Sequence, residues 1–168
     1  MTTVTVDDFK RLIHPLETHP LLTPKEANNL TYQIIELLMD KPCTSQLLQL
    51  LARYLTPQAY DALVEERIIN HHCGYPLCPY SSSSIHDGEV NTVAKRLNMR
   101  AYYKTRYCSK RHYQCSEVFK RQLNSDALFM RMFESTIQDI CVWTYLTFGK
   151  FIFEKLQIGY TMSMHFIE

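Results

Sequence analysis

The chain has 168 residues, of which 46% are apolar, enough to bury the core of one ordinary domain. Its 18 basic and 17 acidic residues leave a formal net charge of +1, which argues against a strongly basic nucleic-acid binder. No run approaches 18 consecutive apolar residues and the N-terminal segment is acidic without an apolar stretch, so we expect neither a membrane span nor a secretory signal.

Four helices are predicted before the first cysteine pair. Their apolar residues recur with helical spacing, and each stripe is typical of a face turned toward a core. Thr23-Pro24 followed by Glu26 indicates a capped helix start, and Thr56-Pro57 repeats the cap and the proline. The expected ranges are 6–16, 24–40, 45–54 and 57–70.

The second half has a different texture. We expect a tight turn at 73–79, an exposed loop near 81–88, a helix at 89–97 and a short strand or hairpin arm at 101–107. Ser109 and Asp126 are each placed to cap a further helix, and the apolar segment 137–158 should form the last helix, packed back on the first ones. The sequence thus predicts a mainly α fold: one helical domain over residues 1–168 with an inserted knuckle rich in cysteine and histidine, at about 67–116, and a short β element.

Two pairs of metal-ligand residues lie within the predicted knuckle. Cys73 and Cys78 flank a turn that contains Gly74, and Cys108 and His112 are spaced by one helical turn. Because an unexported chain keeps its cysteines reduced, metal binding is favoured over disulfides. Zinc takes four such ligands in a tetrahedron, so we interpret these four residues as one structural zinc site with no open position. Four unrelated side chains remain the alternative, because 29 residues separate the two pairs.

Other cysteines and histidines compete poorly for the fourth position. Cys115 lies seven residues after Cys108, about 10 Å along a helix, too far for two sulfurs on one ion. We therefore expect Cys115 to be a small buried residue beneath the site. His71 and His72 precede Cys73 too closely to chelate with it and should be exposed or adjacent to the site. Cys43 and Cys141 have no ligand partner nearby in sequence and are expected in the core.

Three segments resemble the signature of a known family. They are 64–78 (VEERIINHHCGYPLC), 107–116 (YCSKRHYQCS) and 122–131 (QLNSDALFMR). In these segments the chain resembles the fungal regulator-of-transcription proteins, relatives of animal RNA polymerase II-associated protein two. The resemblance spans about residues 8–134. It implies that the pair Cys73 and Cys78 and the pair Cys108 and His112 together bind zinc.

The resemblance also implies a function. Members of the family are described as atypical phosphatases of the heptad-repeat tail of the largest RNA polymerase II subunit, acting on phosphoserine five and in some cases phosphotyrosine one. They associate with the polymerase and are linked to its import into the nucleus, so we expect this chain in both the cytoplasm and the nucleus. We expect no direct nucleic-acid or membrane partner. Family chains usually continue past a domain of this kind, and a further tail that aids binding or traffic is expected in them.

The residues alone offer only a set of polar groups for phosphatase chemistry. No cysteine is followed six positions later by an arginine within a glycine-rich turn, and there is no second metal constellation. We interpret Arg67 as a phosphate clamp and Glu66 as a general base. Tyr102 and Tyr103 are candidate hydrogen-bond donors, or platforms for a heptad tyrosine. A solvated face or a structural ion pair is the alternative for Glu66 and Arg67.

Lys110 and Arg111 are further candidates for binding phosphate, because they stand at a predicted helix N-terminus where unpaired N–H groups favour anions. Ordinary surface charge is the alternative for both. Two other functions therefore stay open beside the phosphatase. One is a non-catalytic zinc adaptor that binds the polymerase and import factors; the other, favoured least, is nucleic-acid binding through the knuckle.

Overall fold

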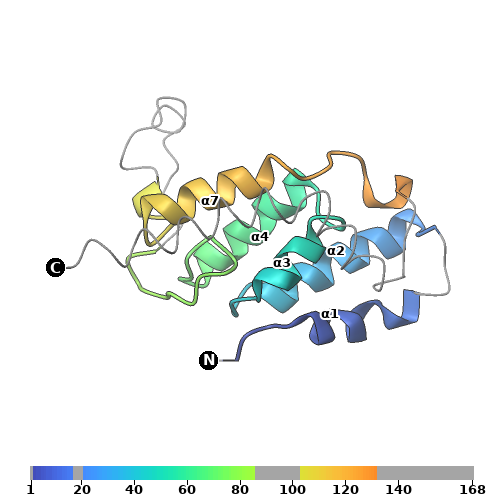
Figure 1. Ribbon diagram of the computed structural model, residues 1–168, viewed down its shortest axis with the longest axis horizontal. Helices are drawn as coiled ribbons and strands as arrows, with labels where there is room; N and C mark the ends of the chain where they lie inside the picture. Colours follow the sequence, from blue (N-terminus) through green and yellow to red (C-terminus); the bar gives the residue numbers. More distant parts are fainter. Residues whose placement is uncertain (1, 17–20, 86–102, 132–168) are drawn as a thin grey trace. The chain divides into compact units, whose positions relative to one another are not determined.

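The computed structural model describes residues 2–16, 21–85 and 103–131. By its internal contacts the chain divides into Met1–Phe133 and Glu134–Glu168, and every described residue belongs to the first unit. The helices among the described residues, coloured along the chain in Figure 1, are α1 (Val6–Ile13), η1 (His14–Leu16), α2 (Pro24–Leu38), α3 (Ser45–Leu51), α4 (Pro57–Ile69), α7 (Lys110–Lys120) and η2 (Leu128–Met130). The mainly α fold is confirmed.

Threonine and serine caps begin the helices where the sequence places them. The Thr23 hydroxyl accepts a hydrogen bond from the Glu26 N–H, and the Glu26 carboxylate accepts one from the Thr23 N–H at 2.8 Å, which closes the predicted capping box. Thr56 caps α4 and Ser109 caps α7 in the same way, through the N–H three residues on. These side chains satisfy N–H groups that a helix start leaves unpaired, so local sequence specifies where α2, α4 and α7 begin.

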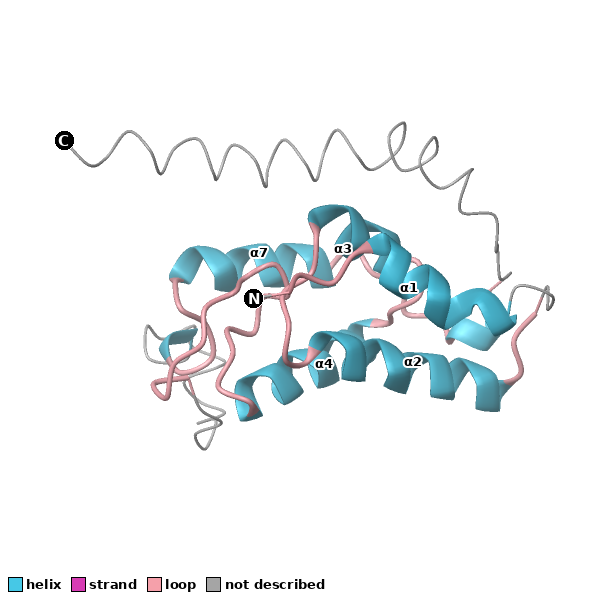
Figure 2. Cartoon of the chain, turned by 90° about the horizontal axis from the view of Figure 1, so that it is seen from below, coloured by secondary structure: helices cyan, strands magenta, loops and turns pink. Residues whose placement is uncertain are grey.

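The helices before residue 70 share one core. In Figure 2, α2 and α4 lie on one side of the described unit and α1, α3 and α7 on the other. Contacts join α2 to α4, and α1 to both α2 and α3. The side chains between the layers are almost all aliphatic or aromatic and almost wholly buried: Phe9, Ile13, Leu30, Ile34, Leu38, Leu47, Leu51, Leu55, Leu63 and Ile68. None of the helices in the described part is both long and apolar enough to span a membrane.

Helix α7 is held against α4 by a contact between two aromatic rings and by a buried hydrogen bond between hydroxyl groups. The rings of Tyr60 and Phe119 lie 5.1 Å apart. The Tyr60 hydroxyl is 2.8 Å from the Ser116 hydroxyl, which also lies 3.2 Å from the hydroxyl of Tyr107. All three hydroxyl residues are buried. A satisfied buried network of this kind permits few alternative dockings, so it fixes the position of α7 along α4.

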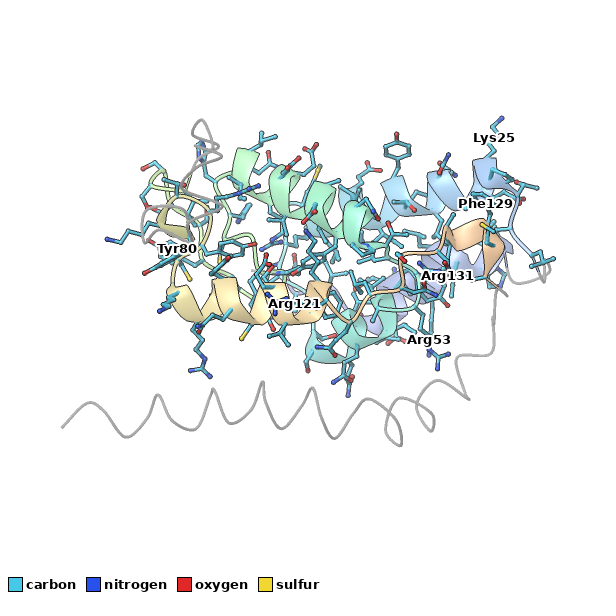
Figure 3. All side chains as sticks on the ribbon, turned by 90° about the horizontal axis from the view of Figure 1, so that it is seen from above. Lys25, Arg53, Tyr80, Arg121, Phe129 and Arg131 are labelled. Atoms are coloured by element: carbon cyan, nitrogen blue, oxygen red, sulfur yellow. The ribbon has the colours of Figure 1, made fainter. Side chains whose placement is uncertain are left out.

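The segment after α7 returns to the first helices. Arg131 donates to the backbone oxygen of Arg53 at 2.8 Å, just beyond α3, and both residues are labelled in Figure 3. The helix predicted after Asp126 is, in the described part, the single 3₁₀ turn η2, which packs on α2. The helices predicted at 89–97 and 137–158 lie outside the described residues, so the single domain over 1–168 stays a prediction.

The aromatic strand predicted at 101–107 is wrong where the structure describes it. The Tyr107 N–H donates to the Tyr103 oxygen at 2.8 Å, which makes residues 103–107 a helical turn. Its rings are used for packing on α7: Tyr103 stacks on Tyr113 with centroids 6.0 Å apart. Among the described residues, β structure is limited to the isolated bridges Val4–Cys43 and His72–Ser81.

The buried hydroxyl network yields a prediction about stability. Ser116→Ala removes the shared partner of two buried tyrosine hydroxyls, so we expect a loss of about 1–3 kcal/mol in the free energy of unfolding. The control Ser125→Ala, at an exposed position, should change it by less than about 0.5 kcal/mol. Urea unfolding of the full chain measures both, and equal effects of the two changes would contradict a role of the network in docking α7.

Candidate metal centre

Four side chains from the two predicted pairs converge. The ligand atoms of Cys73, Cys78, Cys108 and His112 all lie within 4.8 Å of one another. The His112 Nδ1 is 3.7 Å from the Cys73 sulfur and 3.0 Å from the Cys108 sulfur, and the sulfurs of Cys78 and Cys108 are 3.7 Å apart. Zinc bonds of about 2.0–2.3 Å in a tetrahedron place ligand atoms roughly 3.3–3.8 Å apart. The cluster can therefore bind a metal ion, and its donors are those that suit zinc.

The first pair follows a tight ending of α4. His71 adopts φ 60°, and its N–H donates to the Ile68 oxygen while the His72 N–H donates to the Arg67 oxygen. These two bonds form a Schellman ending, with a left-handed residue directly after the cap. The chain reverses there, and the Cys73 N–H pairs with the Tyr80 oxygen at 2.9 Å. The end of α4 thereby sets the direction in which the first sulfur points.

The second pair begins α7. Cys108 comes directly before the cap, Ser109, whose hydroxyl accepts from the His112 N–H at 3.2 Å. Cys108 thus precedes the helix and His112 lies in its first turn, so the cap rather than a shared helix face brings the two side chains together. The His112 ring also lies 5.4 Å from the ring of Tyr75, which covers it from the first pair's turn.

Gly74 lets the two halves of the site approach. Its N–H donates to the Arg106 oxygen at 3.0 Å. A β-carbon at this position would lie 3.0 Å from side-chain carbons of both Tyr107 and Val64. Because no described glycine has a positive φ, glycine is required here for close approach, not for the unusual backbone conformation that the sequence suggested.

The thiols are crowded enough to share protons. The hydrogen bond with Cys78 lowers the pKa of Cys73 to about 4, and the same pairing, with burial, raises the pKa of Cys78. Thiols held this close compete for protons, and metal binding removes that competition because each bound sulfur is a thiolate.

The remaining cysteines and histidines of the described part of the chain stand outside the cluster. Cys115 is half-buried, less covered than predicted, and burial raises its pKa. It does stand six positions before Arg121, but it lies within α7 and Arg121 caps that helix, so no phosphate-binding loop surrounds the sulfur. Cys43 is buried as predicted, and Cys141 lies outside the described residues. His71 is exposed and His72 half-buried, neither being a ligand.

Arg67 is not on the surface. Its side chain is fully buried, and its guanidinium donates to four backbone oxygens, those of Leu38, Lys41, Cys73 and Cys78. Burial lowers its pKa, an effect that the thiols of Cys43, Cys73 and Cys78 oppose. The phosphate clamp predicted at Arg67 needs an accessible guanidinium, and the geometry turns this one inward because its five N–H groups find better partners there.

The other predicted catalytic and phosphate-binding residues are spread over the surface. Glu66 and Lys110 are exposed, Arg111 and Tyr103 are half-buried, and Tyr102 lies outside the described residues. No described contact joins Glu66 to the others.

The acidic residue that does face the aromatic turn is its neighbour, Glu65. The Glu65 carboxylate lies 3.8 Å from the Arg106 guanidinium. The sequence analysis missed this pair and the Tyr103–Tyr113 stack. Helical spacing could have shown that Glu65 and Glu66 point about 100° apart, but not which of them faces residues 40 positions away.

The fold and the site together define a helical domain with an inserted knuckle of three cysteines and one histidine. The model of the Rtr1/RPAP2 family matches residues 53–124, a range that includes all four ligands. The crystal structure of Saccharomyces cerevisiae Rtr1 superimposes with a TM-score of 0.73 at 39% identity, over 82% of this chain and 83% of that one. The Kluyveromyces lactis Rtr1 N-terminal domain gives 0.65 at 33%, over 78% and 86%. The chain belongs to the Rtr1/RPAP2 family, as its resemblance predicted.

Curated relatives carry names that describe an activity. The chain is 39% identical over 145 residues to the RNA polymerase II subunit B1 CTD phosphatase RTR1 of Saccharomyces cerevisiae, covering 80% of this chain and 64% of that protein. It is 30% identical over 104 residues to the putative RNA polymerase II subunit B1 CTD phosphatase rpap2 of Danio rerio, covering 61% and 17%. The chain therefore spans less than two thirds of the length of either relative.

The ligand set can be tested by paired substitutions on α7. His112→Ala should abolish stoichiometric metal binding and much of the cooperative unfolding, because a closed site contributes folding free energy. Cys115→Ala, three residues on, should retain the metal and cost on the order of 1 kcal/mol of packing. Elemental analysis and urea unfolding measure the two effects. Loss of metal from the Cys115 variant, with retention in the His112 variant, would show that the fourth ligand is misassigned.

The close approach at Gly74 gives a second prediction. Gly74→Ala places a methyl group against Tyr107 and Val64, so we expect about 1–3 kcal/mol of destabilisation from overpacking. The double change Gly74→Ala with Val64→Ala should recover part of that loss relative to the sum of the single changes, because it makes room for the methyl group. Strict additivity in thermal or urea unfolding would mean that the contact does not restrict residue 74.

Proposed function

We propose that this chain is a zinc-containing phosphatase that acts on the phosphorylated heptad-repeat tail of the largest RNA polymerase II subunit. Phosphoserine five is the proposed substrate, with phosphotyrosine one as a second. The observation that carries the proposal is the 39% identity, over 80% of the chain, with a yeast protein named as a phosphatase of that tail. The family match over residues 53–124 supports it, because that range includes every described candidate group.

Zinc has a structural role in this proposal. The cluster offers four protein ligands, whereas a catalytic zinc keeps a position for water or substrate. A closed site holds the turn at residues 73–78 against the start of α7. The chemistry is therefore assigned to groups beside the zinc, not to the ion.

Water is the proposed acceptor of the phosphoryl group. Glu66 is proposed as the general base that takes a proton from the attacking water, and its exposure on α4 leaves it open to solvent and substrate. As the water oxygen bonds to phosphorus, the bond from phosphorus to the seryl oxygen breaks, and that oxygen leaves with the electron pair and takes a proton from solvent. Lys110 and Arg111, at the first two positions of α7, are proposed to bind the phosphate, where helix N–H groups add to their charge. Tyr103, and Tyr102 beside it, are proposed to contact the peptide. Arg67 is left out because it is buried.

A non-catalytic adaptor is the second candidate function. It would bind the polymerase and assist its assembly or import through the cytoplasm and nucleus, with import factors as further partners. The burial of Arg67 favours this function, because it removes the strongest predicted phosphate ligand from the surface. An adaptor would bind the phosphorylated tail through surface contacts alone, and it would need no general base to activate water.

Single-turnover release of phosphate from a phosphoserine-five heptad peptide tests the phosphatase. Glu66→Gln should slow release by about 10²-fold or more, the usual contribution of a general base. Glu65→Gln is the matched control, since it removes the neighbouring exposed carboxylate, which pairs with Arg106 instead. Zinc content and thermal unfolding should be unchanged in both variants.

The outcomes separate the two functions. Peptide binding by fluorescence anisotropy, without release of phosphate by the purified wild type, would support the adaptor and refute the phosphatase. Release that is equal in Glu66→Gln and wild type would refute the role of Glu66. Lys110→Ala combined with Arg111→Ala should weaken peptide binding, whereas Lys25→Ala, on α2, should not.

A further inference from the structure

The buried guanidinium of Arg67, on α4, hydrogen-bonds both to the metal-binding turn at residues 73–78 and to the end of α2. Its Nε donates to the Cys73 oxygen at 2.9 Å and its Nη2 to the Cys78 oxygen at 3.1 Å. Its Nη1 donates to the oxygens of Leu38 and Lys41, where α2 ends. One side chain thereby connects the metal-binding turn, α4 and the end of α2.

Two of these four partners are the backbone oxygens of metal ligands. Cys73 and Cys78 begin and end the turn, so the guanidinium holds both ends of it at a fixed separation. A planar fork of five donors can do this, whereas a lysine ammonium supplies three donors from one point. Partners of metal ligands in a second layer commonly fix the ligands' orientation in this way.

The charge of Arg67 has no carboxylate partner among the residues that the structure describes. None of the ion pairs among the described residues involves it, although its side chain is fully buried. A buried cation without a counter-charge is costly. Zinc bound by three thiolates and a neutral imidazole carries a net charge of −1, which would lie one peptide unit away from the guanidinium. The two charges would then offset each other where the guanidinium is fully buried.

We propose that Arg67 is the positioning residue and the counter-charge of the metal centre. It aligns the turn so that the sulfurs of Cys73 and Cys78 face the ion, and it neutralises the thiolate-rich complex. Through the hydrogen bonds from Arg67 to the oxygens of Leu38 and Lys41, metal binding also stabilises the end of α2. The inference rests on the proposed zinc, but not on the proposed phosphatase activity.

Zinc affinity, measured by competition with a chromophoric chelator, tests the inference. Arg67→Lys keeps the charge and loses the fork, so we expect the dissociation constant to rise about 10- to 100-fold, as for other second-layer partners. Arg67→Met loses both and should bind zinc more weakly still. In cobalt-loaded Arg67→Lys, the visible bands of the tetrahedral thiolate complex should also shift.

Matched controls separate this role from general destabilisation. The controls are Ile34→Val and Leu30→Ala, at two buried positions of α2 whose apolar side chains form no hydrogen bond with the turn. Their losses in free energy of unfolding, one small and one large, should span the loss expected for the Arg67 variants. At equal free energy of unfolding, the controls should bind zinc within threefold of wild type and leave the cobalt bands in place. An Arg67→Lys affinity no lower than that of an equally unstable control overturns the inference.

Two further outcomes are decisive. A wild-type chain without stoichiometric zinc overturns both the metal and this inference, whereas a zinc-loaded chain that releases no phosphate overturns only the phosphatase. If the Arg67 variants do not fold, hydrogen exchange in the zinc-loaded wild type decides. The Arg67 Nε–H should then exchange at least tenfold more slowly than that of Arg131, which donates at an exposed site, and equal rates refute the inference.

Discussion

The packing of α7 against α4 determines where the metal ligands meet. One pair of ligands follows the end of α4 and the other begins α7, so neither pair can form a site unless the helices lie side by side. The Tyr60–Ser116 hydrogen bond and the Tyr60–Phe119 ring contact hold the two helices together, and neither contact involves a ligand side chain. The metal centre is in this sense a product of the helical core, unlike a finger whose ligands are brought together by the metal alone.

The scaffold also supplies the details of the site. The Schellman ending at His71 sets the direction of the chain after α4, and Gly74 leaves room for the ring of Tyr107. Arg67 donates hydrogen bonds to both ends of the metal-binding turn. These contacts hold the two halves of the knuckle together and join it to α4 and to the end of α2. Metal binding and helix packing should therefore stabilise each other, and a change in either should be felt in both.

A closed centre limits what the metal can do and directs attention to the surface around it. The described surface carries Glu66 on α4, Tyr103 on the aromatic turn, and Lys110 and Arg111 at the start of α7. These groups come from elements that the knuckle holds together, so a structural ion would influence how they are arranged. Membership in the Rtr1/RPAP2 family makes the polymerase tail the natural substrate to test, and the buried arginine makes binding without catalysis a serious competitor.

The sequence by itself determined the helical class and the starts of the capped helices, because these depend on local caps and periodicity. For the candidate metal site it offered two pairs of ligand residues, whose meeting depends on the packing of α7 on α4. Thr23, Thr56 and Ser109 act on the N–H groups three residues ahead, and such contacts need no distant partner. Only the tertiary structure decided what depends on residues far apart in the chain. Arg67 turned inward because four carbonyls from two segments, the end of α2 and the metal-binding turn, surround its guanidinium. Residues 103–107 formed a helical turn because α7 offered their rings a surface. A charged residue on a helix has the same local pattern whether it faces water or the interior, so its role could not be assigned until its neighbours were known.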